Sequence, residues 1–229
     1  MKVGIMQPYL FPYIGYFHLV QAVDKFVFYD DVNFIKGGWI NRNRILINGK
    51  ESFITLNLSH ASPKKLINQI EVIDNRKKLI KTIKLAYNKA PYFEEVFALM
   101  VQILSYDSTN ISDIAINSII SITEYLKVKT KFIKSSSLPK TLNYKGQERV
   151  IRICKELEGK VYINPIGGLE LYSSKVFKEN GLTLNFLKPT IESYSQFNQE
   201  FIPALSIVDI LMFNGVKKTS EMIKKYTIE

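Results

Sequence analysis

A pair of aspartates and a pair of arginines are the strongest candidates for chemistry in this sequence. Asp30 and Asp31 follow the aromatic run Phe26–Tyr29, and Arg42 and Arg44 come soon after them. Carboxylates at a strand end can act as general bases or as ligands of Mg²⁺, and arginine is suited to bidentate recognition of phosphate. We therefore expect these residues to face a common cleft that receives an anionic ligand.

His60 is a further candidate base, because it enters a loop directly after an apolar strand pattern. His18 follows Phe17 on a predicted helix and is expected to be a packing residue or a wall of the pocket. Cys154 stands alone in an apolar run, which is typical of a buried structural thiol. We expect no histidine or cysteine metal site and no bound cofactor.

The segment that must position these residues reads as a strand, a turn, a helix and a strand. Val3–Met6 is a short apolar run, and Pro8 and Pro12 forbid a regular helix or a central strand directly after it. From about Gly15 the apolar residues recur at helical spacing until the strand Phe26–Asp30. Two strands joined by one helix should be parallel, with a right-handed crossover. The pattern predicts an α/β fold with a mainly parallel, Rossmann-like sheet flanked by helices.

In such a unit the ligand binds beyond the carboxyl ends of the strands, near a helix N-terminus. The first turn and the glycine-containing segment after the second strand would line this crevice. Their candidate substrate-binding residues are Gln7, Tyr9, Tyr13, Gly15, Tyr16, Trp39, Asn41, Arg42 and Arg44. The second segment also reads as a β-hairpin around Asn48–Gly49, and both interpretations hold if the hairpin presents the arginines. A later glycine turn adds Asn164, Gly167 and Gly168, as a substrate contact or as a plain tight turn.

The middle of the chain has helical periodicity. Apolar positions recur over Asn75–Lys89, Tyr92–Leu104 and Ser112–Leu126, which indicates a helical lobe at about residues 64–130 within a single unit of residues 1–229. The small polar residues of Ser135–Pro139 are the best linker candidate in the chain.

Composition narrows the class of protein. The 229 residues are 46% hydrophobic and 23% charged, which is ordinary for a soluble protein. The net charge of +10 comes mostly from lysines on amphipathic segments, so we expect solvated helix faces and no nucleic-acid partner. An anionic small substrate is equally compatible with this charge. No apolar run reaches the roughly 18 residues of a membrane span, and the N-terminal region is unlike a signal peptide. We expect a cytoplasmic protein without stable membrane insertion; the sequence leaves its oligomeric state open.

The whole chain resembles the WbqC-like family of bacterial O-antigen and related surface-polysaccharide biosynthesis. The resemblance rests on the segments MQPYLFPYIGYF, VDKFVFYDDVNFIKGGWINRNRIL, SPKKLINQIEV, YINPIGGLELY and FNQEFIPALSIVDILMFNG. It implies a cytoplasmic transferase that places an aminoacyl or other acyl group on the amine of a nucleotide-linked amino sugar. The acyl group would come from an acyl carrier protein or from coenzyme A.

A weaker likeness concerns the class I nucleotidyltransferases, which carry His-x-Gly-His where this chain has Tyr13-Ile14-Gly15-Tyr16. Three classes therefore stay open. The first is the transferase, with His60 or an aspartate as base. The second is a nucleotidyltransferase-like enzyme, with Asp30 and Asp31 on Mg²⁺. The third is a non-catalytic nucleotide-sugar binding or scaffold protein.

Overall fold

The first strand of the chain lies at the centre of a mixed, mostly parallel sheet. The computed structural model describes residues 1–197 and 200–229; Asn198 and Gln199, within the FNQEFIP segment, lie outside them. The sheet has the order β10-β9-β8-β1-β2-β7, and its strands are β1 (Lys2–Met6), β2 (Lys25–Phe28), β7 (Lys131–Lys134), β8 (Val161–Pro165), β9 (Thr183–Pro189) and β10 (Tyr226–Ile228). All neighbours pair in parallel except β9 and β10.

The predicted parallel pairing of the first two strands is confirmed. Met6 of β1 lies opposite Phe28 of β2, and helix α1 (Ile14–Ala22) makes the crossover between them. From β1 the chain builds the sheet outward through β2 and β7 and then returns to the other side of β1 with β8. The direction of building thus reverses between β1 and β8, and in open α/β sheets such a reversal leaves a crevice at the carboxyl ends of the strands.

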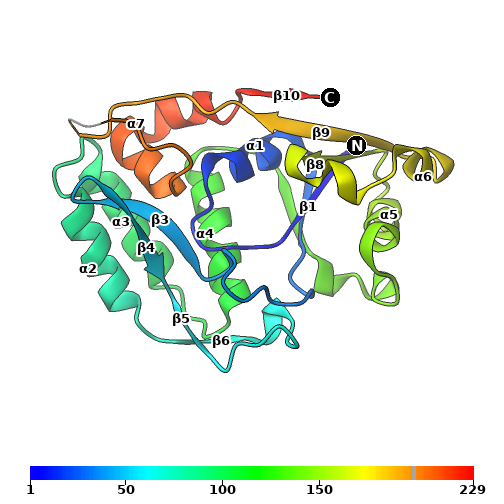
Figure 1. Cartoon of the computed structure of the whole chain (residues 1–229), viewed down its shortest axis with the longest axis horizontal. Helices are drawn as coiled ribbons and strands as arrows, with labels where there is room; N and C mark the ends of the chain where they lie inside the picture. Colours follow the sequence, from blue (N-terminus) through cyan, green and yellow to red (C-terminus); the bar gives the residue numbers. More distant parts are fainter. Residues whose placement is uncertain (198–199) are drawn as a thin grey trace.

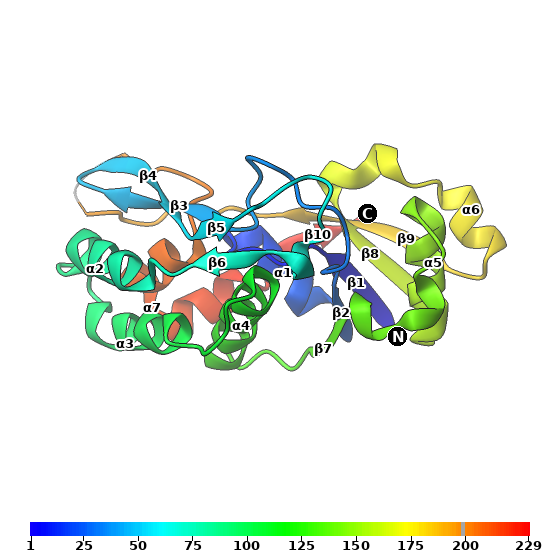
Figure 2. The same cartoon turned by 90° about the horizontal axis from the view of Figure 1, so that it is seen from below.

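Helices cover both faces of this sheet (Figures 1 and 2). On one face α5 (Gly146–Glu156) and α6 (Ser174–Glu179) bury Val150, Cys154 and Phe177 against Val3 and Tyr162. A larger core on the other side joins α1, α4 (Ile111–Tyr125) and α7 (Ile207–Met222) to the helices α2 (Arg76–Tyr87) and α3 (Phe93–Leu104). The fold is therefore α/β with a mixed central sheet; the narrower expectation of a Rossmann-like sheet stays a prediction.

The predicted hairpin is present outside the main sheet. Strands β3 (Arg42–Ile47) and β4 (Lys50–Thr55) pair antiparallel. The turn residues Asn48 and Gly49 both have positive φ, at 49° and 77°, as a two-residue type I′ turn requires. A second small antiparallel pair is formed by β5 (Asn57–Ser59) and β6 (Glu71–Ile73).

Two expectations about the middle of the chain need correction. Residues 64–73 contain no α-helix; their backbone forms the short 3-10 turn η1 (Ile67–Gln69) and strand β6. The supposed linker after β7 is also structured, as the 3-10 turns η2 (Ser135–Ser137) and η3 (Pro139–Thr141), and Ser135 is fully buried. Helices α2, α3 and α4 do occupy the predicted spans, but a distinct helical lobe stays a prediction.

Candidate functional site

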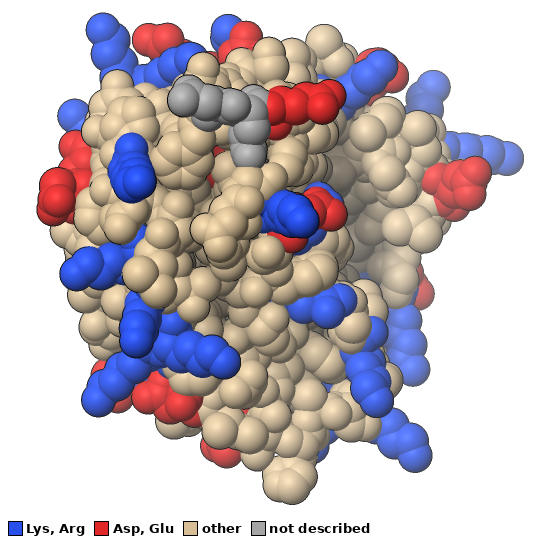
Figure 3. All heavy atoms as spheres, turned by 60° about the vertical axis from the view of Figure 1, so that its left-hand side comes forward, with Lys and Arg blue, Asp and Glu red and all other residues tan. Residues whose placement is uncertain are grey.

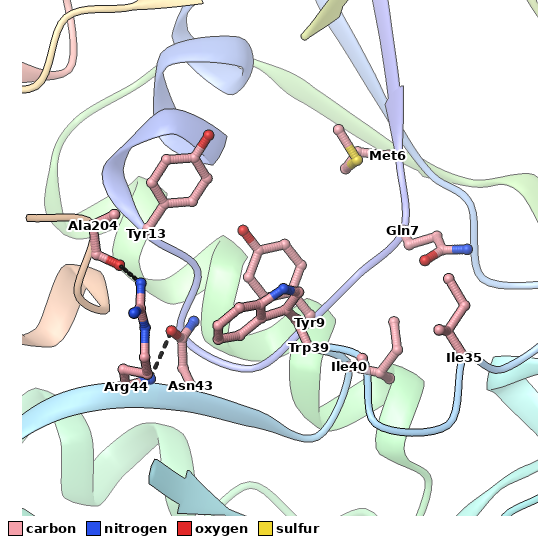
Figure 4. A pocket seen from close by; sticks show the side chains of 11 residues that line it. Met6, Gln7, Tyr9, Tyr13, Ile35, Trp39, Ile40, Asn43, Arg44 and Ala204 are labelled. Atoms are coloured by element: carbon pink, nitrogen blue, oxygen red, sulfur yellow. Dashed lines mark hydrogen bonds between the residues drawn. The ribbon is translucent and has the colours of Figure 1, made fainter. Parts of the chain in front are cut away.

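A cavity of about 560 Å³ opens beside the carboxyl end of β1. Three segments converge on it in Figure 4: the chain after β1, the residues that lead into the β3–β4 hairpin, and the loop before α7. The lining residues are Met6, Gln7, Tyr9, Tyr13, Ile35, Gly38, Trp39, Ile40, Asn43, Arg44 and Ala204. The walls are thus mainly apolar and aromatic, with amide, hydroxyl and guanidinium groups set among them, which is the usual character of a small-molecule site.

Asn43 joins the first two walls. Its side-chain amide donates to the carbonyl oxygens of Leu10 (3.1 Å) and Phe11 (2.7 Å), and its Oδ1 accepts from the backbone amide of Arg44 (2.8 Å). The amide of Leu10 also donates to the carbonyl of Ile40 (3.0 Å). Phe11 has a φ of 44°, a strained value for a residue other than glycine, and Asn43 holds it there. Asn43 therefore fixes the shape of the turn on which the aromatic wall stands.

The tyrosines of the first wall are packed in a set order. Tyr16 is buried behind Tyr9, with ring centroids 5.2 Å apart, and its hydroxyl donates to the carbonyl of Gln7 (3.2 Å). Tyr13 lies over Gly15, where an added Cβ would be only 2.2 Å from the tyrosine hydroxyl oxygen. Gly15 is therefore required for Tyr13 to pack over the start of α1. The ring of Tyr13, rather than the first helical amides, faces the cavity.

Burial decides the protonation of the cavity tyrosines. Burial raises the pKa of both the Tyr9 and the Tyr13 hydroxyl, since a phenolate would lose hydration there. Both hydroxyls therefore stay protonated at neutral pH and can donate hydrogen bonds to a ligand oxygen. They are poorly suited to remove a proton from a substrate.

Two arginines flank the hairpin side of the cavity, and they differ in what they bind. Arg44 lines the cavity; it donates to Glu51 (2.8 Å) and to the carbonyl of Ala204 (3.3 Å). Arg42 donates to the carbonyls of Gly38 (2.9 Å) and Gly37 instead. Gly37 has a φ of 76°, so the turn that Arg42 braces needs glycine. Arg44 can therefore meet a ligand, whereas Arg42 shapes the turn.

The third wall is held by a buried carboxylate. Asp209, at the start of α7, accepts hydrogen bonds from Tyr87 (2.7 Å), Tyr194 (2.6 Å) and the Gln196 amide (2.8 Å). Gln196 in turn accepts from the backbone amide of Ile202 (2.7 Å), just before Ala204. Burial raises the pKa of Asp209, although the three donors oppose this shift. This network fastens the loop that completes the cavity.

The expected common cleft of aspartates and arginines is wrong. Asp30 lies in a closed network after β2 and β7, where it accepts from the Ser135 hydroxyl (3.0 Å) and from the Ser136 amide (3.0 Å) and hydroxyl (2.7 Å). Asp31 shares the single Ser135 hydroxyl proton with Asp30 and forms an ion pair with Arg149 at 2.5 Å. The side chains of this pair are only 4% and 6% exposed. The carboxylates are therefore neutralised inside the protein, and neither is among the residues that line the cavity with Arg44.

Other predicted site residues also lie away from the cavity walls. His60 is exposed after β5 with a φ of 49°. The amide of Asn41 donates to the carbonyl of Leu56 (2.7 Å) and so joins β3 to the end of the hairpin. Asn164 is buried, accepts from the Tyr162 hydroxyl (2.9 Å) and packs against Gly168, where an added Cβ would lie 2.0 Å from its amide nitrogen. The turn of Gly167 and Gly168, the 3-10 helix η4 (Ile166–Leu171), is held by these internal contacts.

The structure thus places Gln7, Tyr9, Tyr13, Trp39 and Arg44 of the predicted set on the cavity, with Gly15 and Tyr16 directly behind its aromatic wall. Sequence reasoning missed Asn43, although the alternation of amides and arginines around it was a usable signal. It also missed Ala204. The sequence carries no signal for this residue, because it contacts Arg44 through its backbone carbonyl.

His18 and Cys154 are packing residues, as expected. Nε2 of His18 lies 3.1 Å from the carbonyl of Met222, and burial lowers the pKa of the ring. Cys154 is buried, and burial raises the pKa of its thiol to about 12, so it stays protonated. Among the described residues no cluster of three or more His, Cys, Asp or Glu side chains has the arrangement of a metal site.

The surface charge is spread out on the face drawn in Figure 3. Lysine and arginine side chains lie both around its outline and within it, and acidic side chains lie between them. In the part of the chain that the structure describes, no helix is both long and apolar enough to cross a membrane.

The structure is that of an α/β protein with a cavity at the carboxyl edge of its sheet. Comparison with known proteins places the chain in a family: the WbqC-like protein family matches residues 7–221, so the chain belongs to it. It is similar to the "uncharacterized protein Rv1507c" of Mycobacterium tuberculosis (strain ATCC 25618 / H37Rv), with 27% identity over 223 residues that cover 94% of this chain and 95% of the relative. No solved structure gives a significant match.

Proposed function

We propose that this protein is a cytoplasmic transferase of bacterial surface-polysaccharide (O-antigen) biosynthesis that moves an aminoacyl or acyl group onto the amine of a nucleotide-linked amino sugar. The observation that carries the proposal is the cavity itself, with Tyr9, Tyr13 and Trp39 among its walls and one arginine, Arg44, at its side. Membership of the WbqC-like family supports the choice of pathway. The place of the cavity at the reversal of strand order fits nucleotide binding in a Rossmann-like sheet.

The lining supports a sugar ligand in particular. Aromatic rings pack against the C–H faces of a sugar ring, while hydroxyl and amide groups bind the sugar hydroxyls. Tyr9, Tyr13 and Gln7 supply such groups here. Arg44 would bind the phosphates, because a charge-assisted hydrogen bond contributes about 1.5–3 kcal/mol. The N-terminus of α1 contributes less to phosphate binding than a bare helix end would, since Tyr13 covers Gly15.

The acyl transfer would rest mainly on binding and orientation. The sugar amine attacks the carbonyl carbon of a thioester, a C–N bond forms and the C–S bond breaks. The amine gives up one proton and the leaving group departs as a thiol. An apolar cavity favours the neutral, nucleophilic form of an amine by desolvation. The protonated hydroxyls of Tyr9 and Tyr13 are suited to stabilise the oxyanion of the tetrahedral intermediate.

The acyl donor would be a thioester of an acyl carrier protein or of coenzyme A, and the protein would need no cofactor of its own. His60 and the aspartates are poor candidates for a base in this scheme. His60 is exposed beyond β5, and Asp30 and Asp31 are bound to serines and Arg149. The proton would therefore pass to solvent or to the departing thiolate.

One observation favours a second candidate, a non-catalytic nucleotide-sugar binding or scaffold protein. Among the described residues that line the cavity there is no Asp, Glu or His. A nucleotidyltransferase-like reaction has less support, because a divalent cation at Asp31 would have to displace Arg149.

The decisive experiment is incubation of the pure protein with UDP-linked amino sugars and a panel of acyl-coenzyme A and acyl-carrier thioesters, followed by mass spectrometry of the sugar. A Trp39→Ala variant serves as the cavity control, and Leu171→Ala serves as a matched exposed control, since Leu171 is 70% exposed on η4. A mass gain on the sugar that Trp39→Ala abolishes and Leu171→Ala keeps supports the transferase. Binding without product supports the scaffold, and absence of binding refutes both.

A further inference from the structure

Two half-exposed aromatic rings lie side by side at the mouth of the cavity. Trp39 is 46% exposed and Phe53 is 51% exposed, and their ring centroids are 5.9 Å apart at an interplanar angle of 37°. Contiguous exposed apolar surface on a protein marks interaction sites and ligand-binding grooves, whereas single exposed apolar residues are ordinary. We call this pair the aromatic platform. Phe53 is not among the residues that line the cavity, so the platform extends the site outward onto the hairpin.

The hairpin register explains why the platform forms. Arg44 lies directly opposite Phe53, and Arg42 lies two positions earlier on the same strand face. The Arg42 guanidinium lies 4.7 Å from the Phe53 ring centroid, and that of Arg44 lies 5.5 Å from Trp39. Each ring is therefore braced by a cation, and about half of each residue stays open to solvent. The two guanidinium groups thus hold the rings in place as a stacking surface.

Arg44 links the platform to the cavity. Its guanidinium packs on Trp39, and its side chain also lines the cavity. Trp39 lines the cavity as well, and Phe53 lies beside Trp39 outside the cavity. The platform, the arginine and the cavity are thus neighbours, as are the base, the phosphates and the sugar of a nucleotide-linked sugar.

We propose that the aromatic platform of Trp39 and Phe53 binds the nucleobase of the ligand, with Arg44 on the phosphates and the sugar in the cavity. This inference rests on the proposed function for the sugar end only. Stacking uses the π-face that every base has, so the platform should discriminate weakly between bases. The carboxylate of Glu51, paired with Arg44 at 2.8 Å and 52% exposed, competes with the phosphates for the guanidinium.

The test measures binding by calorimetry with UMP, GMP, a UDP-linked amino sugar and N-acetylglucosamine 1-phosphate as separate probes. Phe53→Ala should weaken the binding of both nucleotides and of the UDP-sugar about tenfold, because loss of base–aromatic stacking has an effect of this order. The sugar 1-phosphate should be unaffected. Phe53→Tyr should restore binding, and Tyr106→Ala, at a residue 42% exposed after α3, is the matched control. Glu51→Gln should tighten binding of every phosphate-bearing probe, a gain that misfolding cannot produce.

The outcomes separate this inference from the proposed function. If UMP and the UDP-sugar bind equally well to the parent and to Phe53→Ala, the platform is refuted and the proposed function stands. If nucleotides bind through Phe53 but no nucleotide-linked sugar is bound more tightly than UMP, the platform stands and the proposed function fails. If Phe53→Ala alters only the oligomeric state, measured by light scattering, the platform is a protein contact and the inference is wrong. Failure of every probe to bind refutes both.

Discussion

The cavity beside β1 and the Asp30–Asp31–Arg149 network after β2 lie at the same edge of the sheet but differ in what their polar groups bind. In the network the carboxylate oxygens already accept from serines, a backbone amide and a guanidinium, and the ion pair is almost fully buried. Beside β1 the polar groups project from apolar walls around a space of about 560 Å³. Charged residues at strand ends therefore indicate a ligand site only where the protein leaves them room and bonding capacity.

The same comparison explains why the more strongly charged region is the less promising one. Burying an ion is costly unless it is paired, so a stable fold pairs a buried charge with another group of the protein. Aromatic side chains carry no such cost and can remain exposed at a cavity. The following predictions test this division, in order of decreasing expected effect.

Loss of the buried cation should have the largest effect on stability. Arg149→Met leaves Asp31 buried without its partner and should lower the free energy of unfolding by about 3–5 kcal/mol. Urea denaturation followed by circular dichroism measures this change. Arg152→Met, on the same helix with its cation 3.9 Å from an exposed Glu148, is the control and should change stability by less than about 1 kcal/mol. If Arg149→Met keeps its stability but loses ligand binding, Arg149 belongs to the binding site instead.

Removal of the Asn43 side chain should affect both stability and the cavity. Asn43→Ala leaves the buried carbonyl of Leu10 without its side-chain donor and leaves that of Phe11 with the Ser206 hydroxyl alone, so we expect a loss of about 2–3 kcal/mol. Asn41→Ala is a matched control, because Asn41 donates to one carbonyl only and should cost about 1 kcal/mol. Nucleotide-sugar binding, measured at a temperature where both variants are folded, should weaken only for Asn43→Ala. Equal binding by the two would show that Asn43 does not shape the site.

The two hairpin arginines should separate by their effect on binding. Arg44→Ala should weaken binding of a UDP-linked sugar about tenfold, which corresponds to about 1.4 kcal/mol of binding free energy, and should leave the fold intact. Arg42→Ala should weaken it less, because Arg42 acts through the turn of Gly37 and Gly38. Calorimetry at low and high salt checks the result, since only the direct phosphate contact should lose strength with salt. A larger effect of Arg42 would reverse the assignment.

The smallest effect concerns the pH dependence of the loop anchor. The pKa of Asp209 is raised by burial above its ordinary value of 3.8, so between these two pKa values the folded protein binds more protons than the unfolded chain. Stability from this group is then lost as pH rises through that window. Asp209→Asn should remove this loss, so the difference in unfolding free energy between variant and parent should change from pH 4 to pH 7. A difference independent of pH would contradict the raised pKa.

Much of the fold was predictable from local pattern. The prolines after β1, the helical spacing from Gly15 and the aromatic run of β2 predicted the parallel unit that the structure contains. Asn48–Gly49 predicted the hairpin, because few other dipeptides adopt positive φ at both positions without cost. These features depend on residues close together in the sequence, and the sequence itself determines them.

The division of the polar residues was decided by tertiary structure. Arg149 is 118 residues from Asp31, and Ser135 is 105 residues from Asp30, so no local pattern could show that these carboxylates were already paired. Ser135, which read as part of a linker, is buried because it supplies part of that pairing. Ala204 reaches the cavity through a backbone carbonyl, which every residue possesses and no sequence pattern marks. The sequence by itself thus determined the first two strands, the helix between them and the aromatic residues near the cavity. Tertiary structure decided which polar groups remained available to a ligand. The cost of burying a polar group depends on its neighbours, and only the folded chain brings those neighbours together.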